Sequence, residues 1–97
     1  DESAAPDVPV INGAGLILAP GFIDVHTHGG GGFSLHTEDP NEIRSYARWA
    51  PSTGVTAFLV GIVGVPGGLP LEQIDAAVHA VKIPGKGAEA LGIRNPR

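Results

Sequence analysis

Two histidines separated by one residue, His26 and His28, are the part of the sequence best suited to chemistry. His26 is the last residue of a run, residues 22–26, in which a strand is expected, and His28 lies two residues later. Alternate side chains of a strand share a face, so Asp24, His26 and His28 should point the same way, with the imidazoles about 7 Å apart along the chain. Neutral imidazole is a ligand for zinc, iron and related ions. The spacing predicts that His26 and His28 can bind one divalent metal ion.

A run of four glycines, Gly29, Gly30, Gly31 and Gly32, follows the candidate ligands directly. The backbone N–H groups of such a loop can bind phosphate. Glycine also allows tight turns and close approach of a substrate, and the run lacks the spacing and lysine of a P-loop. The four glycines are therefore candidate substrate-binding residues, and a purely structural turn is an equally good interpretation.

Other chemically capable side chains have simpler interpretations. Asp24 could support a metal ligand or act as a general acid or base, but a hydrogen-bonding residue within the strand is favoured. His36 could approach a substrate phosphate, and a loop histidine is favoured. His79 is interpreted as a solvated helix residue and Trp49 as a packing residue. No residue is assigned a catalytic role.

The elements that must position the histidines alternate along the chain. Asp39 is suited to cap a helix that starts at Pro40, with Glu42 in the position of a capping box, and Gly54 ends that helix. A second helix is expected from Leu71, by the helical spacing of its apolar residues. Strands are expected at residues 22–26, 55–62 and 90–93. The unbroken apolar run at 55–62 suits a parallel strand covered on both faces. Consecutive βαβ units predict an α/β fold with a parallel sheet.

Residues 1–20 are expected to form a separate N-terminal part. Residues 1–7 are a polar, acidic lead-in, and the apolar runs 8–12 and 16–19 are separated by Gly13 and Gly15. Two such runs could pair as a short β-hairpin. Residues 21–97 then make up the βαβαβ portion.

Composition excludes several classes of function. The net charge of −4 and scattered basic residues argue against nucleic acid as a partner. The absence of cysteine excludes disulfides and thiolate metal sites. Residues 51–71 carry no charge, but their apolar core is about half of the ~20 residues that a membrane span needs, and glycine and proline interrupt them. A buried strand and loop are favoured, with no membrane partner. No signal-peptide pattern is present, and a cytoplasmic location is expected.

A longer motif gives these residues a family context. Residues 18–28, which read LAPGFIDVHTH, resemble the first barrel strand of the amidohydrolase superfamily, where a Pro-Gly-x-x-Asp-x-His-x-His segment supplies two metal ligands. The glycine run narrows the resemblance to the N-acetylglucosamine-6-phosphate deacetylases. Residues 52–59, STGVTAFL, look like that family's second barrel strand, and residues 87–93 look like the approach to its third.

The resemblance implies a partial (β/α) barrel with two to three parallel strands and two helices. It implies a divalent metal, zinc or iron, held in part by His26 and His28. It also implies hydrolysis of the N-acetyl group of an amino-sugar phosphate. The family's third strand continues into a His-x-Glu-Gly-Pro segment that this sequence lacks after Ile93, and the later strands with the catalytic aspartate are absent. A catalytic metal takes about three protein ligands, and a barrel needs on the order of 250 residues. An N-terminal fragment, inactive alone, is expected, in agreement with the absence of methionine.

Two alternatives from other classes remain open. The glycine run beside two histidines also suits a small α/β module that folds by itself and binds phosphate or metal. A zinc site tighter than micromolar would favour that module. The second alternative is a non-catalytic, self-associating chain, a homo-oligomer, because three parallel strands with helices on one face leave the other face uncovered.

Overall fold

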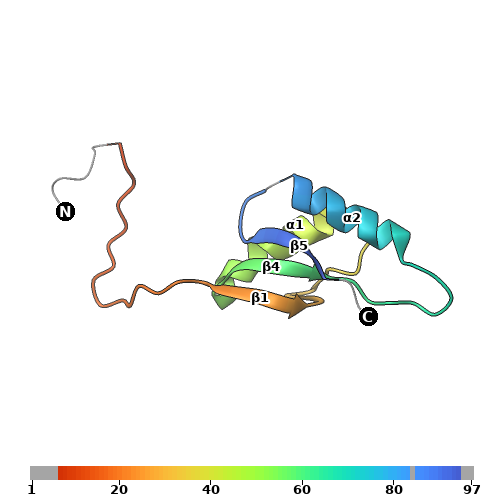
Figure 1. Ribbon diagram of the computed structural model, residues 1–97. Helices are drawn as coiled ribbons and strands as arrows, with labels where there is room; N and C mark the ends of the chain where they lie inside the picture. The colour runs from red at the N-terminus through yellow and green to blue at the C-terminus, as the bar shows by residue number, and fades with distance from the viewer. Residues whose placement is uncertain (1–6, 84, 95–97) are drawn as a thin grey trace.

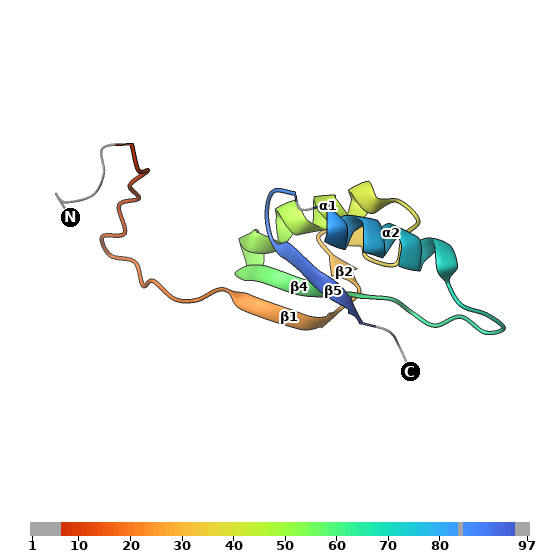
Figure 2. The same ribbon diagram turned by 45° about the horizontal axis from the view of Figure 1, so that its top comes forward.

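The computed structural model describes residues 7–83 and 85–94, and its centre is a parallel sheet of three strands. β1 (Phe22–Thr27) and β5 (Glu89–Arg94) flank β4 (Val55–Gly61), which gives the strand order β1–β4–β5 (Figure 2). Both neighbouring pairs are parallel. The α/β class, the three parallel strands and their alternation with two helices are confirmed.

Helix α1 (Pro40–Trp49) begins where the sequence predicts. The Asp39 side chain accepts a hydrogen bond from the Asn41 backbone N–H at 2.9 Å, as an N-cap does. Glu42 does not complete a capping box, because its Oε1 instead accepts the backbone N–H of Ser34 at 2.8 Å. The cap is confirmed, and Glu42 ties the first turn of the helix to the segment before it.

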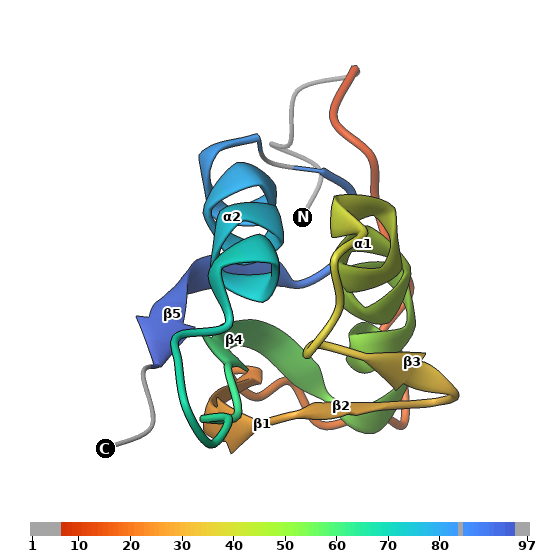
Figure 3. The ribbon, with the colours of Figure 1, turned by 90° about the vertical axis from the view of Figure 1, so that its right-hand side faces the viewer.

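Three short elements complete the fold around α1. The 3-10 helix η1 (Ala50–Thr53) follows α1 and ends at Gly54, whose φ of 87° is left-handed, so this glycine stops the helical region as predicted. Between β1 and α1, β2 (Gly29–Gly30) and β3 (Phe33–Ser34) pair antiparallel beside α1 (Figure 3). Helix α2 (Leu71–Lys82) connects β4 to β5.

Both helices lie on the same face of the sheet, and the core fills the space between them and β4 (Figures 1 and 3). Phe58 and Val60 of β4 are fully buried. The Tyr46 ring of α1 meets the Phe58 ring edge-on, with centroids 4.9 Å apart. Small side chains of α2, Ala76 and Ala77, complete the packing. The sheet is therefore packed on one face against a single layer of helices.

Among the described residues, no such layer covers the other face of the sheet. On β1, Ile23 and Val25 remain 61% and 59% exposed, and on β4 the side chains of Ala57 and Leu59 are only half-buried. The prediction that β4 is covered on both faces is wrong for the described residues. The prediction that helices cover one face and leave the other bare is confirmed.

The N-terminal hairpin predicted from residues 8–19 is wrong. Residues 7–21 contain no strand, and this segment runs away from the sheet (Figure 1). Its apolar side chains stay in solvent: Ile11 is 90% exposed and Ile17 95%. An isolated two-stranded hairpin is marginally stable in water, and here no packed layer lies against it. Residues 1–6 of the predicted lead-in lie outside the described residues.

The uncharged stretch 51–71 contains the predicted strand, β4, and the loop after it, together with most of η1 and the first residue of α2. Over the described part of the chain, neither helix has the length and apolar composition that crossing a membrane requires.

Candidate functional site

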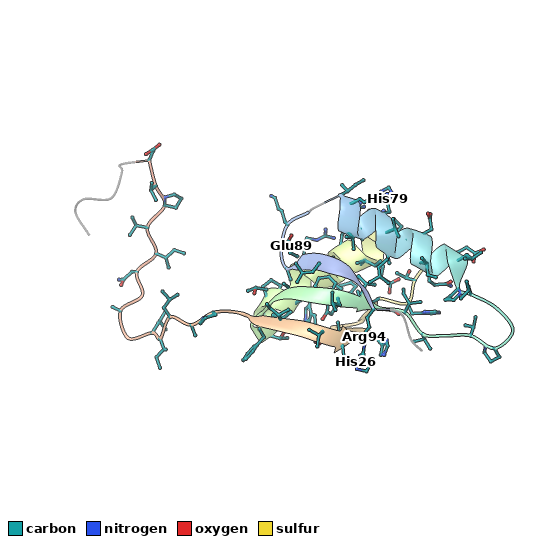
Figure 4. The ribbon with its side chains drawn as sticks, in the orientation of Figure 1. His26, His79, Glu89 and Arg94 are labelled. Atoms are coloured by element: carbon teal, nitrogen blue, oxygen red, sulfur yellow. The ribbon has the colours of Figure 1, made fainter. Side chains whose placement is uncertain are left out.

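His26 and His28 lie together where β1 ends. His26 belongs to the strand and His28 follows its last residue, at the carboxyl end of the sheet (Figure 4). Their rings are 5.3 Å apart between centroids and meet edge to face at 85°. Both side chains are exposed. Two nitrogen ligands of one zinc ion lie within about 4 Å of each other, since each Zn–N bond is 2.0–2.1 Å. The ring centroids of two imidazoles that bind one ion lie farther apart than their nitrogens, so a centroid separation of 5.3 Å is compatible with a shared ion.

Thr27, between the two histidines, faces the opposite way. It is buried, and its Oγ1 lies 3.4 Å from the hydroxyl of Tyr46 on α1. The same oxygen accepts the backbone N–H of Gly29 at 3.2 Å. Because neighbouring strand residues point to opposite faces, burying Thr27 beneath α1 directs both histidines away from the helices. The helix layer thus fixes the direction of the imidazoles indirectly.

The ring of His28 contacts Gly61, the last residue of β4. The Nδ1 atom of His28 lies 3.4 Å from the carbonyl oxygen of Gly61. A carbonyl only accepts hydrogen bonds, so this contact requires the proton on Nδ1 and leaves the Nε2 lone pair free for a metal. A Cβ at position 61 would come within 2.9 Å of His28 Nδ1 and 2.3 Å of the Thr27 carbonyl oxygen. The absence of a side chain here makes room for the ligand.

Asp24 does not join the histidines in one regular row. Its Oδ1 accepts the backbone N–H of His26 at 3.1 Å, so it serves as a hydrogen-bonding residue within the strand, the favoured interpretation. Asp24 pairs with Phe58 and Thr27 with Val60, and the register shifts between these pairs. The strict alternation that would place Asp24, His26 and His28 on one face is therefore interrupted.

The described residues fit part of a metal site. No group of three histidine, cysteine, aspartate or glutamate side chains that could hold an ion occurs in residues 7–83 and 85–94. A catalytic zinc normally has three protein ligands and one water. His26 and His28 are suited to supply two nitrogen ligands, one with its tautomer set by a backbone carbonyl. Any further protein ligand would come from outside the described residues.

The glycine run forms the β2–β3 hairpin. Gly31 and Gly32 stand at its turn, both with positive φ, 59° and 86°. A Cβ on Gly31 would lie 2.3 Å from the indole of Trp49, which packs against this segment. The turn and the Trp49 contact account for glycine here, in line with the structural interpretation. Contact of Gly29, Gly30, Gly31 and Gly32 with a substrate stays a prediction.

The remaining candidates are His36, His79 and Trp49. His36 is half-buried in the loop before α1, and its Nδ1 accepts the backbone N–H of Val63 at 3.4 Å. His79 is exposed on α2, as predicted (Figure 4). Trp49 is partly buried and packs against the core, also as predicted. The backbone N–H of Leu35, the residue before His36, donates to the His28 carbonyl oxygen at 2.9 Å, but His36 forms no three-ligand group with the pair among the described residues.

A cavity of about 400 Å³ lies elsewhere, between α1, α2 and the start of β5. Its lining is mostly apolar and includes four alanines, with Arg44 and Glu89 as the charged residues. Glu89 is the first residue of β5, whereas His26 lies near the carboxyl end of β1, so this cavity is at the opposite end of the parallel strands (Figure 4). It is not part of the histidine site.

Sequence reasoning did not single out Thr27 or Gly61. For Thr27 a signal existed, because a hydroxyl between two outward-pointing strand residues must face the helix layer. For Gly61 the signal was weaker: a glycine at the end of a predicted strand becomes informative only once that strand is known to lie beside β1.

The chain has homologues among deacylases of the amidohydrolase family. It is 42% identical over 65 residues to N-acyl-D-aspartate deacylase of Alcaligenes xylosoxydans xylosoxydans, an alignment that covers 67% of this chain and 11% of that enzyme. It is 37% identical over 82 residues to N-acyl-D-glutamate deacylase of the same organism, covering 84% of this chain and 15% of that enzyme. The chain thus spans less than a sixth of the length of either relative. No protein-family model matches it, and no solved structure matches it. These homologues support the amidohydrolase relationship at the level of deacylases and not the amino-sugar phosphate as substrate.

Proposed function

We propose that this chain contributes two metal ligands, His26 and His28, to the active site of a metal-dependent deacylase. The observation that carries the proposal is the pair of adjacent imidazoles at the carboxyl end of a parallel strand, with His28 held at Nδ1 by the Gly61 carbonyl. Active sites of parallel α/β barrels collect at that end of the strands. The deacylase homologues support the same class of reaction.

The proposed fold of the active protein is a (β/α) barrel in which β1, β4 and β5 are the first three barrel strands. The helices lie on one face of the sheet, as they would on the outside of a barrel, and the bare face with Ile23 and Val25 would turn inward. Further strands beside β5 and β1 would close the sheet into a barrel. Closure would enclose that face, and the added strands would bring the missing ligands.

The chemistry proposed is hydrolysis of an N-acyl amide. A bound zinc or iron ion supplies Lewis-acid polarisation of the amide carbonyl and a water activated as nucleophile. His26 and His28 would bind that ion through nitrogen. Thr27 and Gly61 would hold the two rings in position. Thr27 anchors β1 to α1, and the carbonyl oxygen of Gly61 would accept a hydrogen bond from Nδ1 of His28. With two ligands among the described residues, turnover by this chain alone is not expected.

Two substrate classes follow from two kinds of similarity. The relatives are named for N-acyl-D-aspartate and N-acyl-D-glutamate. The glycine run after His28 resembles the N-acetylglucosamine-6-phosphate deacetylases and favours an amino-sugar phosphate. Both classes carry an acylated amine, so the proposed reaction at the metal is the same for either.

Zinc titration by calorimetry tests the metal site. The unaltered chain should bind zinc more weakly than micromolar, as a two-ligand site does. His26→Ala and His28→Ala should each weaken binding more than roughly tenfold. His79→Ala, which removes an exposed histidine on α2, is the matched control and should bind as the unaltered chain does. Equal binding by the His26, His28 and His79 variants would refute the proposal, and a site tighter than micromolar would favour an independent metal-binding module.

The exposed sheet face supports a second candidate function, self-association without catalysis. Ile23, Val25 and the exposed Leu91 of β5 present apolar surface that parallel sheets rarely leave in water. Sedimentation should then show a dimer or larger assembly whose dissociation follows from Val25→Lys, while His79→Ala leaves it intact. A folded monomer at all concentrations would exclude this candidate.

A further inference from the structure

Arg94, the last residue of β5, lies on the bare face of the sheet. It pairs with Gly61 of β4, and the preceding residue Ile93 pairs with Val60. Val60 is fully buried under the helices and Ile93 packs against the same core. Since successive residues of a strand point to opposite faces, the Gly61–Arg94 pair faces away from the helices. Arg94 itself is exposed.

The same Gly61 receives the His28 ring. Neighbouring strands lie about 4.8 Å apart, so the side chain of Arg94 starts one strand away from the residue on which His28 rests. The backbone N–H of Ile62 donates to the Arg94 carbonyl oxygen at 3.3 Å, which holds the end of β5 beside the end of β4. Figure 4 shows His26 and Arg94 at the same end of the sheet.

The guanidinium of Arg94 has a chemistry that the two histidines lack. A guanidinium is a cation with a planar fork of N–H donors that matches a carboxylate or a phosphate. The two carboxylates of the described outer strands do not compete closely. Asp24 accepts the His26 N–H, and Glu89 begins β5, about 16 Å from Arg94 at 3.3 Å per residue.

We propose that Arg94 binds the oxyanion of a substrate whose acylated amine lies at His26 and His28. This inference rests on the deacylase function proposed above and adds the feature that selects the substrate. Both substrate classes considered there carry such a group, a carboxylate in N-acyl-D-aspartate or N-acyl-D-glutamate and a phosphate in the amino-sugar phosphate. Arg94 is then a specificity-determining residue that favours anionic over neutral N-acyl compounds. The basis of this role is the position of its positive charge at the same end of the sheet as the two imidazoles.

Nuclear magnetic resonance of the whole chain tests the inference, with the Nε–H signal of Arg94 and the ring C–H signals of His26 and His28 as reporters. The probes are N-acetyl-D-aspartate, N-acetylglucosamine 6-phosphate and neutral N-acetylglucosamine, each with and without zinc. At least one anionic probe should shift the arginine and histidine signals together, and the neutral sugar should not. Which anion does so distinguishes the carboxylate from the phosphate.

Variants identify the residue responsible. Arg94→Gln should weaken anion binding by roughly tenfold or more, because a charge-assisted hydrogen-bond pair is lost, and Arg94→Lys should restore part of it. Arg48→Gln, on the exposed side of α1, is the matched control and should bind as the unaltered chain does. Equal binding of the anions by Arg94→Gln, or equal shifts with the neutral sugar, overturns the inference.

The two proposals fail separately. If zinc does not bind to His26 and His28 while the anion shifts still depend on Arg94, the deacylase function is refuted and the oxyanion site stands. If zinc binds and the Arg94→Gln variant takes up the anions unchanged, the metal site stands and the role of Arg94 is refuted.

Discussion

The imidazole of His28 rests on Gly61, with its Nδ1 3.4 Å from the glycine carbonyl oxygen. This contact joins the end of β1 to the end of β4 and sets which ring nitrogen can face a metal. It depends on a missing side chain, because a Cβ at position 61 would press into both His28 and the Thr27 carbonyl.

Gly61→Ala should therefore destabilise the fold and displace the ligand. Overpacking of this kind costs typically about 1–3 kcal/mol, measured as a loss in the free energy of unfolding in denaturant. Zinc affinity should fall with it. Gly68→Ala, at an exposed glycine with open space around its Cβ position, is the control and should stay within about 0.5 kcal/mol. An unchanged zinc affinity in a folded Gly61→Ala chain would contradict this account.

Thr27 and Tyr46 should act as a coupled pair. Thr27→Val keeps the shape but removes the side-chain acceptor of the half-buried Gly29 N–H, and loss of such a hydrogen bond costs about 0.5–1.5 kcal/mol. Tyr46→Phe removes the other hydroxyl of the 3.4 Å contact. The double variant should lose less unfolding free energy than the two single losses added together. Strict additivity in this cycle would show that the two hydroxyls do not interact.

The sequence was sufficient for features whose signals are local. Asp39 caps α1 and Gly54 ends the helical region because capping and left-handed φ are decided within a few residues. The alternation of strands and helices was also readable, since each element has its own apolar period.

Features that depend on distant partners could not be read from the sequence. The apolar runs at 8–12 and 16–19 have strand composition, but a strand needs a neighbouring strand and a packed face, and the described part of the chain provides neither for them. At the site, no local sequence pattern indicates that Gly61 lies against His28 or that Gly31 lies against Trp49. Each of those contacts joins residues from different elements, whose pairing follows from the whole fold.

Gly31 and Gly32, at the turn of the β2–β3 hairpin, allow two reasons for the presence of glycine to be tested separately. Gly31→Ala and Gly32→Ala both place alanine at positive φ, which costs about 1–2 kcal/mol. At Gly31 the new methyl group also meets the Trp49 indole, whereas at Gly32 nothing lies within 4 Å. Gly31→Ala should therefore lose more unfolding free energy and shift the fluorescence of Trp49, the single tryptophan of the chain. Equal effects of the two substitutions would mean that only the backbone conformation requires glycine.

The core beneath α1 depends on one phenylalanine. Phe58 is fully buried against Tyr46, so Phe58→Ala should cost about 3–5 kcal/mol of unfolding free energy, a large fraction of the stability of a domain this small. Phe22→Ala removes the same number of atoms from a side chain that is 70% exposed and should cost far less. Near-ultraviolet circular dichroism and denaturant unfolding measure both. If the two variants unfold alike, the helices do not pack on β4 as described, and the histidines lose the layer that directs them.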